Sequence, residues 1–323
     1  MNKIETDIPF LIIGFLRTDN ILKLVNSISE QSDSRIYISI DGPRSIKEKE
    51  IQDLLIEKIN EKKKVIKNDV FIRHHRKNLG IGCGVVSAID WFFESVEFGV
   101  ILEDDLEISG SLIAYVEIVR KILLENNDIW MASGTRVSPI QDRKTITASN
   151  YPQIWGWMTS KEKWNEIRKA MLREKKYQIK NLFSYKSNYF LVGARRVFAG
   201  KIDTWDIPIA YEMYMNKKKC LLPPVNLITN TGNDNLSTHT TIAEPSVYLP
   251  RYLIDEITLP DKIDSIEVEI QNRYLEENVF LMKRRHSLLP IYSFFTDVIR
   301  FPKKYRLEKY KSRLKEIPKK KSF

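Results

Sequence analysis

The sequence predicts an α/β protein: a mostly parallel sheet flanked by helices, followed by a basic, partly helical C-terminal extension. Short apolar runs alternate with helix-like segments over roughly the first hundred residues. Such alternation is typical of parallel sheets with helices on both faces. The 323 residues are 43% hydrophobic, which suffices for a large core. Lys and Arg gather beyond residue 282, which sets the extension apart from the rest of the chain.

Four apolar runs account for the predicted strands. Ile, Val, Leu, Phe and Tyr dominate them, and these residue types favour strands that are buried on both faces. In chain order the runs cover residues 9–15, 36–40, 69–74 and 98–102.

The connecting segments carry helix signals. The first helix is expected at about residues 19–30, with Asp19 as its N-cap. Its apolar stripe has helical spacing and consists of Ile21, Leu22, Leu24, Val25 and Ile28. Further helices are expected at about residues 46–62, 84–94 and 263–280.

Three adjacent carboxylates, Glu103, Asp104 and Asp105, follow the apolar run 98–102. Like charges repel, so such a cluster at the end of a buried strand is difficult to explain by structure alone. Carboxylate oxygens are preferred ligands of Mg²⁺ and Mn²⁺, and a bound metal can neutralise the phosphates of a nucleotide. A solvated acidic turn is the alternative interpretation.

Other polar residues follow the first three predicted strands. Arg17, Asp41 and His74 come after or at the ends of runs 9–15, 36–40 and 69–74. In parallel sheets, ligands bind beyond the carboxyl ends of the strands, so we expect these side chains to share one rim with the acidic triplet. The structural alternatives are a surface Arg17, a turn-capping Asp41 and a solvated His74.

Gly80 opens the sequence Gly-Ile-Gly-Cys-Gly. No Lys-Ser or Lys-Thr follows, so this is not a P-loop, and its spacing does not match the dinucleotide fingerprint. A tight loop that opens a helix and lets the backbone approach a donor molecule is the preferred interpretation. Simple loop flexibility is the alternative.

The order of these motifs resembles that of nucleotide-sugar glycosyltransferases with the GT-A fold, in particular N-acetylglucosaminyltransferase I and similar bacterial enzymes. The resemblance covers roughly residues 8–165, and residues 203–240 are similar to the acceptor half of the bacterial members. Residues 166–202 are longer than in the eukaryotic enzyme. The motifs that carry the likeness are Arg17, Asp41, the run 74–80, the acidic run 103–107 and Gly156-Trp157-Met158.

The resemblance implies a role for each residue of the donor side. Asp41 and His74 would meet the polar edge of the base, with uracil expected, and Arg17 would lie near the phosphates. Asp104 would contact the ribose, Glu103 would face the donor sugar and Asp105 would hold the metal. These residues form the predicted nucleotide-sugar site together with Gly14 and Gly80.

The second half of the chain is expected to bind the acceptor. Trp155 and Trp157 flank a glycine and offer surfaces on which a sugar could stack, although core packing is the commoner fate of Trp. Of the two, Trp155 is expected to face the site and Trp157 to pack. Asp206 is the preferred general base of an inverting transfer. Competing interpretations are a base at Asp203 or Glu212, or a helix-capping role for Asp206. In many GT-A enzymes a late histidine reaches the metal, which would make His239 a ligand, with a plain surface histidine as the alternative.

Charge is distributed unevenly. Beyond residue 282 there are 14 Lys or Arg and three acids, a net charge of +11, so residues 1–282 carry about −1 of the total +10. Local basicity of this kind disfavours a general nucleic-acid binder. Apolar residues between 288 and 301 have basic flanks, which suits a helix on anionic lipid. Packing of that helix on the catalytic domain is the alternative.

Two isolated cysteines, Cys83 and Cys220, and the absence of a long apolar run or a signal-peptide pattern predict a cytoplasmic protein, with peripheral attachment to the inner face of the plasma membrane through its tail. The expected organisation is a catalytic domain at 1–240, with its nucleotide-sugar half at 1–130 and its acceptor half at 131–240, and an extension at 241–323.

The sequence thus predicts a Mn²⁺- or Mg²⁺-dependent, inverting glycosyltransferase that moves a sugar from a UDP-linked donor to a lipid-linked or surface-glycan acceptor, as in lipopolysaccharide or capsule synthesis. One alternative is a sugar-phosphate nucleotidyltransferase, although those enzymes have a glycine-rich loop with Arg and Lys after the first strand, where this chain has Gly14-Phe15-Leu16-Arg17. The other is a non-enzymatic basic adaptor for membrane or nucleic acid.

Overall fold

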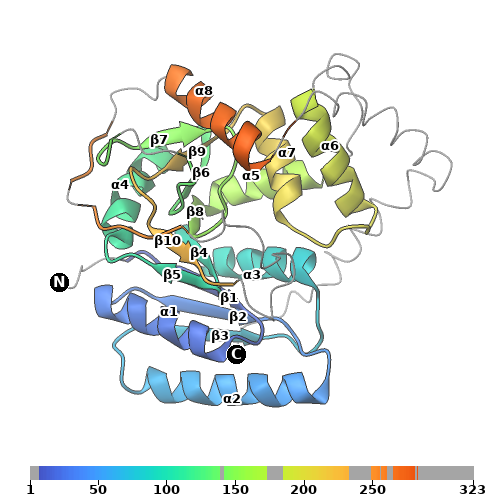
Figure 1. The fold of residues 1–323 in the computed structure, drawn as a ribbon. Coiled ribbons are helices and arrows are strands. Elements are labelled where there is room, and N and C mark those ends of the chain that lie inside the picture. The colour runs from blue at the N-terminus through green and yellow to red at the C-terminus, as the bar shows by residue number, and fades with distance from the viewer. Residues whose placement is uncertain are drawn as a thin grey trace.

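The computed structural model describes residues 7–138, 142–172, 185–232, 249–254, 256–259, 265–280 and 282. Their strands form an eight-stranded sheet of order β3-β2-β1-β4-β8-β6-β9-β7 and a two-stranded sheet of β10 and β5 (Figure 1). The strands are β1 (Phe10–Gly14), β2 (Ile36–Ile40), β3 (Val70–His74), β4 (Phe98–Glu103), β5 (Leu106–Ile108), β6 (Ile129–Ser133), β7 (Thr147–Ser149), β8 (Trp157–Ser160), β9 (Lys219–Leu222) and β10 (Ile228–Asn230).

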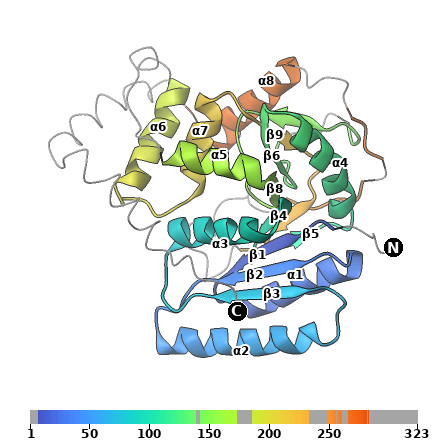
Figure 2. The ribbon, with the colours of Figure 1, turned by 180° about the vertical axis from the view of Figure 1, so that it is seen from behind.

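Helices cover both faces of the sheet, as the strand–helix alternation predicts. In Figure 2, α1 and α2 lie on one side of strands β1–β3, and α3 lies on the other. The helices are α1 (Thr18–Gln31), α2 (Ile46–Lys63), α3 (Ile81–Ser95), α4 (Leu112–Glu125), α5 (Lys161–Met171), α6 (Tyr185–Phe198), α7 (Asp206–Met215), α8 (Ser265–Tyr274) and the π-helical turn η3 (Leu275–Val279).

The N-terminal half of the sheet is parallel, with β1 between β2 and β4, and β2 paired with β3. Beyond β4 the sheet is mixed, because β8 inserts antiparallel between β4 and β6. Strand β9 then pairs parallel with β6, and β7 closes the sheet antiparallel to β9. The predicted α/β class, with a mostly parallel sheet flanked by helices, is therefore confirmed.

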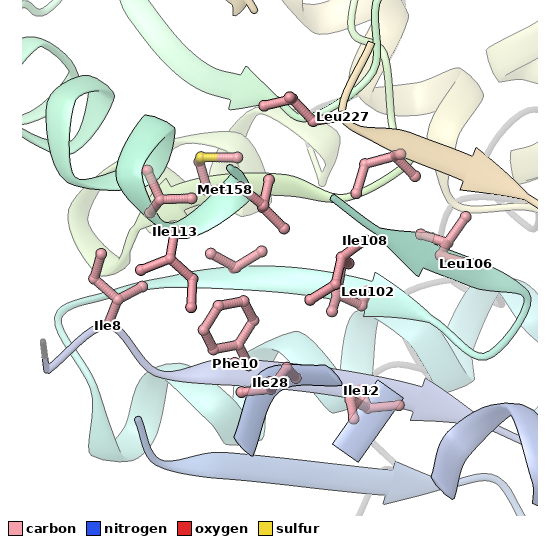
Figure 3. Packing of buried hydrophobic residues seen from close by; sticks show 14 of the residues in the cluster. Ile8, Phe10, Ile12, Ile28, Leu102, Leu106, Ile108, Ile113, Met158 and Leu227 are labelled. Atoms are coloured by element: carbon pink, nitrogen blue, oxygen red, sulfur yellow. The ribbon is translucent and has the colours of Figure 1, made fainter. Parts of the chain in front are cut away.

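Burial on both faces explains why the strands are apolar at successive positions. Phe10 and Ile12 of β1 point toward Ile28 of α1 and the neighbouring Leu102 of β4 (Figure 3). Leu11, between them in sequence, points to the opposite face and packs with residues of α3. All four of these strand side chains are inaccessible to solvent. Burial of each such side chain contributes about 1.5–3 kcal/mol before entropy is subtracted.

The described part of the predicted extension packs on the domain instead of standing apart. The hydroxyl of Ser109 donates to the carbonyl oxygen of Tyr252 at 2.6 Å. On α8, the side chain of Asn272 donates to that of Asn150 at 2.8 Å and accepts from the Asn150 main-chain N–H at 2.9 Å. No helix in these described segments is long and apolar enough to cross a membrane. The basic tail beyond residue 282 lies outside the described residues.

Candidate active site

Strand register brings the predicted rim together. Gly14 is level with Ile40, Ile40 is level with His74, and Ile13 is level with Glu103. The chain leaves these four parallel strands at the same end of the sheet. Arg17, Asp41, His74 and the acidic triplet therefore gather at one rim because short apolar strands of equal direction end together.

The turn between β4 and β5 holds the acidic triplet. Asp104 is 7% exposed, and its Oδ2 accepts the main-chain N–H of Phe15 at 2.9 Å. Its Oδ1 accepts from Nη1 of Arg17 at 3.0 Å, and the same Nη1 lies 3.6 Å from Oδ2 of Asp105. Arg17 thus neutralises part of the charge that the three carboxylates bring together.

The carboxyl group of Glu103 is strongly perturbed. Burial raises its pKa well above the ordinary value, and the charges of Asp105, Asp104 and Asp206 raise it further, in that order, while Arg17 acts in the opposite direction. The influence of Asp206 comes from α7, about a hundred residues further along the chain. The acid expected to face the donor sugar and the expected general base therefore belong to one electrostatic group.

A second segment covers Asp105. The main-chain N–H and the hydroxyl of Thr231 both donate to the Asp105 carbonyl oxygen, at 2.7 and 3.0 Å. Gly232 follows, and its carbonyl oxygen accepts from Nη2 of Arg17 at 3.4 Å. A Cβ atom at residue 232 would lie only 2.2 Å from Oδ2 of Asp105. Glycine is needed here because the backbone passes so close to the carboxylate.

The donor chemistry of this rim fits Mg²⁺ or Mn²⁺ bound together with a diphosphate. Such ions are commonly held by one or two carboxylates, with substrate phosphates and water completing the coordination. Asp105 supplies a partly exposed carboxylate beside a cation that suits phosphate. Within the described segments no group of three His, Cys, Asp or Glu side chains forms a metal cage. His239 lies outside the described residues.

Asp41 is committed to the backbone of the glycine loop. Its Oδ1 accepts from the N–H groups of Gly42 and Leu79 at 2.8 and 2.9 Å, and its Oδ2 accepts from Gly80 at 3.1 Å. Burial nevertheless raises its pKa, and the charge of Asp203 adds to that shift. The turn-capping alternative for Asp41 is thus realised, because its two oxygens already accept from three main-chain N–H groups.

Asp203 closes the same loop from the other side. Its two oxygens accept from the N–H groups of Ile81 and Gly82, both at 3.1 Å. Gly80 has φ of 78°, and a Cβ atom there would lie 2.4 Å from Asp203 Oδ2. The glycine lets the loop approach a carboxylate of the protein itself. Two protein carboxylates thus occupy the N–H groups of the loop, and close contact of its backbone with the donor stays a prediction.

His74 is anchored by a buried glutamine. Its Nε2 lies 2.9 Å from Oε1 of Gln52, whose Nε2 donates to the carbonyl oxygens of Asp41 at 2.8 Å and Phe15 at 3.2 Å. Gln52 is fully buried although it is polar. It therefore ties the ends of β1, β2 and β3 to helix α2.

Asp206 is the first residue of α7, and its Oδ1 accepts from the Thr204 hydroxyl. Its charge raises the pKa of Glu103 and contributes to the raised pKa of Tyr189. Of the competing bases, Asp203 caps the start of α3, and Glu212 is only 5% exposed. Asp206 therefore remains the preferred candidate for the general base. It lies in the first turn of α7, and its charge raises the pKa of Glu103 in the acidic triplet.

The tryptophans separate into two environments. Trp157 is 1% exposed and stacks on Trp205 with 5.7 Å between ring centroids and an interplanar angle of 20°. For Trp157 the core-packing interpretation therefore holds, because β8 turns this ring into the core, where it cannot stack on an acceptor. Trp155 is partly exposed and keeps its place as an acceptor-binding candidate. Gly14 serves packing, since a Cβ atom there would lie 2.4 Å from Ile21 Cδ1.

Two residues of the rim escaped the sequence analysis. Gln52 interrupts the apolar stripe of α2 that contains Leu55 and Ile59, and a polar residue in such a stripe is the signal that could have identified it. Asp203 was considered only as a general base, because no local pattern shows that it reaches the glycine loop more than a hundred residues earlier.

Comparisons with known proteins indicate only a distant likeness. No protein-family model matches the chain, and no curated protein matches it either. Solved structures similar to it include HddC from Yersinia pseudotuberculosis, with 10% identity, a TM-score of 0.28, and coverage of 48% of this chain and 77% of HddC. Mannose-1-phosphate geranyltransferase from Thermus thermophilus has 8% identity, a TM-score of 0.32, and coverage of 67% and 73%. Similarity at this level does not bear on activity.

Proposed function

We propose that this protein is a metal-dependent glycosyltransferase that transfers a sugar from a nucleotide diphosphate, UDP by expectation, to a hydroxyl group of a glycan or lipid-linked acceptor. The observation that carries the proposal is the electrostatic group at the rim. Asp105, Glu103 and Asp206 come from two distant segments, yet both aspartates raise the pKa of Glu103. A phosphate-binding edge and a base for the acceptor would thereby face the same donor sugar.

Each part of the rim has a task in this proposal. Asp105 would hold Mg²⁺ or Mn²⁺, which when bound neutralises the diphosphate and makes it a better leaving group. Arg17, held in place by its ion pair with Asp104, would place a second positive charge near the diphosphate. The buried carboxylate of Asp104 would meet the ribose. Glu103, at the end of β4 beside Asp104 and Asp105, would face the donor sugar.

The reaction proceeds in one inverting step. The acceptor oxygen forms a bond to C1 of the donor sugar while the bond from C1 to the diphosphate oxygen breaks, with oxocarbenium character in the transition state. Asp206 takes the proton of the acceptor hydroxyl. Trp155 offers the partly exposed aromatic surface on which the acceptor sugar would stack.

A screen of nucleotide sugars tests the proposal. The purified protein is incubated with each donor and Mn²⁺ or with EDTA, and release of the nucleoside diphosphate is measured. Metal-dependent release from a UDP-sugar supports glycosyl transfer. A parallel reaction contains a nucleoside triphosphate and a sugar 1-phosphate. Pyrophosphate release there, without donor hydrolysis, would instead indicate the nucleotidyltransferase alternative.

A further inference from the structure

The orientation of the Gln52 amide is fixed by its surroundings. Its Nε2 lies within hydrogen-bond distance of the carbonyl oxygens of Asp41 and Phe15, and a main-chain carbonyl can only accept. The amide must therefore present both hydrogens to these two carbonyls. Rotation by 180° would bring oxygen against oxygen in a fully buried position, which is strongly unfavourable.

The fixed amide determines the protonation of His74. Oε1 of Gln52 faces Nε2 of His74 at 2.9 Å, and an amide oxygen cannot donate. The hydrogen bond exists only if His74 Nε2 carries a proton. In the neutral imidazole the other nitrogen, Nδ1, is then an acceptor. Among the described residues, the His74 side chain makes no other hydrogen bond.

The surroundings of His74 keep the ring neutral near pH 7. Burial lowers the pKa of His74. Asp53 on α2 raises it by less than burial lowers it, and Lys49 on the same helix lowers it further. Next to it, His75 has its pKa lowered to about 4, first by burial and then by Arg73 and His74. A neutral ring held as the Nε2–H form thus remains at the end of β3, level with Ile40 at the end of β2.

We propose that Gln52 is a specificity-determining residue of the nucleotide site. By holding His74 with Nδ1 as an acceptor, it makes the ends of β2 and β3 recognise a base that donates an N–H, such as N3–H of uracil. The inference rests on the proposed function and on the expectation, drawn from the resemblance, that His74 meets the base, but the tautomer can be measured without any nucleotide.

The first measurement is the ¹⁵N spectrum of the imidazole at pH 8, with His74 assigned by comparison with His74→Gln. Wild-type protein is expected to show one neutral form, protonated at Nε2, with a proton resonance protected from exchange with water. In Gln52→Lys, position 52 can only donate, so the tautomer is expected to invert to Nδ1–H. In Gln52→Glu, the carboxylate is expected to hold His74 as imidazolium. An Nδ1–H form or a mixture in wild type would overturn the proposal, even if neither variant folds.

The second measurement compares UDP with N3-methyl-UDP, which lacks the base N–H, by calorimetric titration in Mn²⁺. Leaving a buried acceptor unsatisfied costs about 1–3 kcal/mol, so wild type is expected to bind the methylated probe about 5- to 150-fold more weakly. In Gln52→Glu this ratio is expected to fall toward one. Asn60→Asp, which adds the same charge at an exposed position of α2, should retain it.

The outcomes separate the two proposals. Equal affinity of wild type for both probes would overturn the role of Gln52 while leaving nucleotide binding intact. A complete lack of UDP binding would overturn the proposed function and base selection with it, whereas the tautomer result would still stand or fall by the spectrum alone.

Discussion

Replacement of Gly232 by alanine tests the close contact between the segment after β10 and the acidic triplet. The added Cβ would lie 2.2 Å from Asp105 Oδ2 and 2.8 Å from both Asp105 Cγ and Cβ, whereas real Cβ contacts stay above 3.0 Å. Rotation of the carboxylate relieves the first contact but cannot move Asp105 Cβ. The backbone must therefore separate by a few tenths of an ångström, against the two hydrogen bonds from Thr231 to the Asp105 carbonyl oxygen.

We expect Gly232→Ala to lower the free energy of unfolding by about 1–3 kcal/mol, the usual effect of overpacking a closely packed position. Equilibrium denaturation of Gly232→Ala, Asp105→Ala and the double variant measures it. Asp105→Ala removes the clashing Oδ2 and Cγ atoms and leaves only the contact with Asp105 Cβ. The double variant should therefore be more stable than the sum of the single effects predicts, by about 0.5–1 kcal/mol.

Gly200→Ala is the control for this cycle. Nothing lies within 4 Å of a Cβ atom at residue 200, so its effect comes from its φ of 68° alone and should add to that of Asp105→Ala. The assigned contact between residue 232 and Asp105 would be refuted if Gly232→Ala had the same free energy of unfolding as wild type. It would also be refuted if the effects of Gly232→Ala and Asp105→Ala were strictly additive.

Three further predictions concern the base, the perturbed acid and the tail. Asp206→Asn should retain UDP binding and lose transfer by about 10²–10⁴-fold, the usual effect of removing a general base; near-normal turnover would exclude Asp206. The raised pKa of Glu103 means that the folded state holds its proton more tightly than the unfolded state, so wild type should lose stability relative to Glu103→Gln as pH rises above about 4.5, until the folded-state pKa is passed. If the difference in free energy of unfolding between wild type and Glu103→Gln did not change with pH, the raised pKa of Glu103 would be contradicted. Truncation after Met282 should abolish salt-sensitive cosedimentation with anionic vesicles and preserve donor hydrolysis; vesicle binding by the truncated protein would disprove the role of the tail.

Local patterns predicted the N-terminal part of the fold. Strands β1 to β4 could be predicted because each is an apolar segment that ends at polar residues. The gathering of Arg17, Asp41, His74 and the acidic triplet at one rim could be predicted because parallel strands of similar length end together. The start of α3 was displaced, since Ile81 and Gly82 already belong to the helix, capped by Asp203. Sequence patterns carry no sign of that cap because it comes from a distant segment.

Long-range pairing explains the remaining differences. Strand β8 lies antiparallel between β4 and β6, a position set by partners that are far away in the sequence. This placement buries Trp157 against Trp205, a partner that the motif alone does not reveal. The role of Gln52 likewise depends on tertiary structure, because its hydrogen bonds to Phe15, Asp41 and His74 form only when α2 packs over the ends of β1, β2 and β3.

The central claim is that the acidic rim binds a nucleotide diphosphate together with a divalent metal. Calorimetric titration of UDP into wild type, Asp105→Ala and the control Glu107→Gln, each in Mn²⁺ and in EDTA, tests it most directly. The account predicts binding by wild type and Glu107→Gln in Mn²⁺ only, and none by Asp105→Ala. Equal affinity of Asp105→Ala and wild type for UDP in Mn²⁺, or wild-type binding that persists unchanged in EDTA, would contradict it.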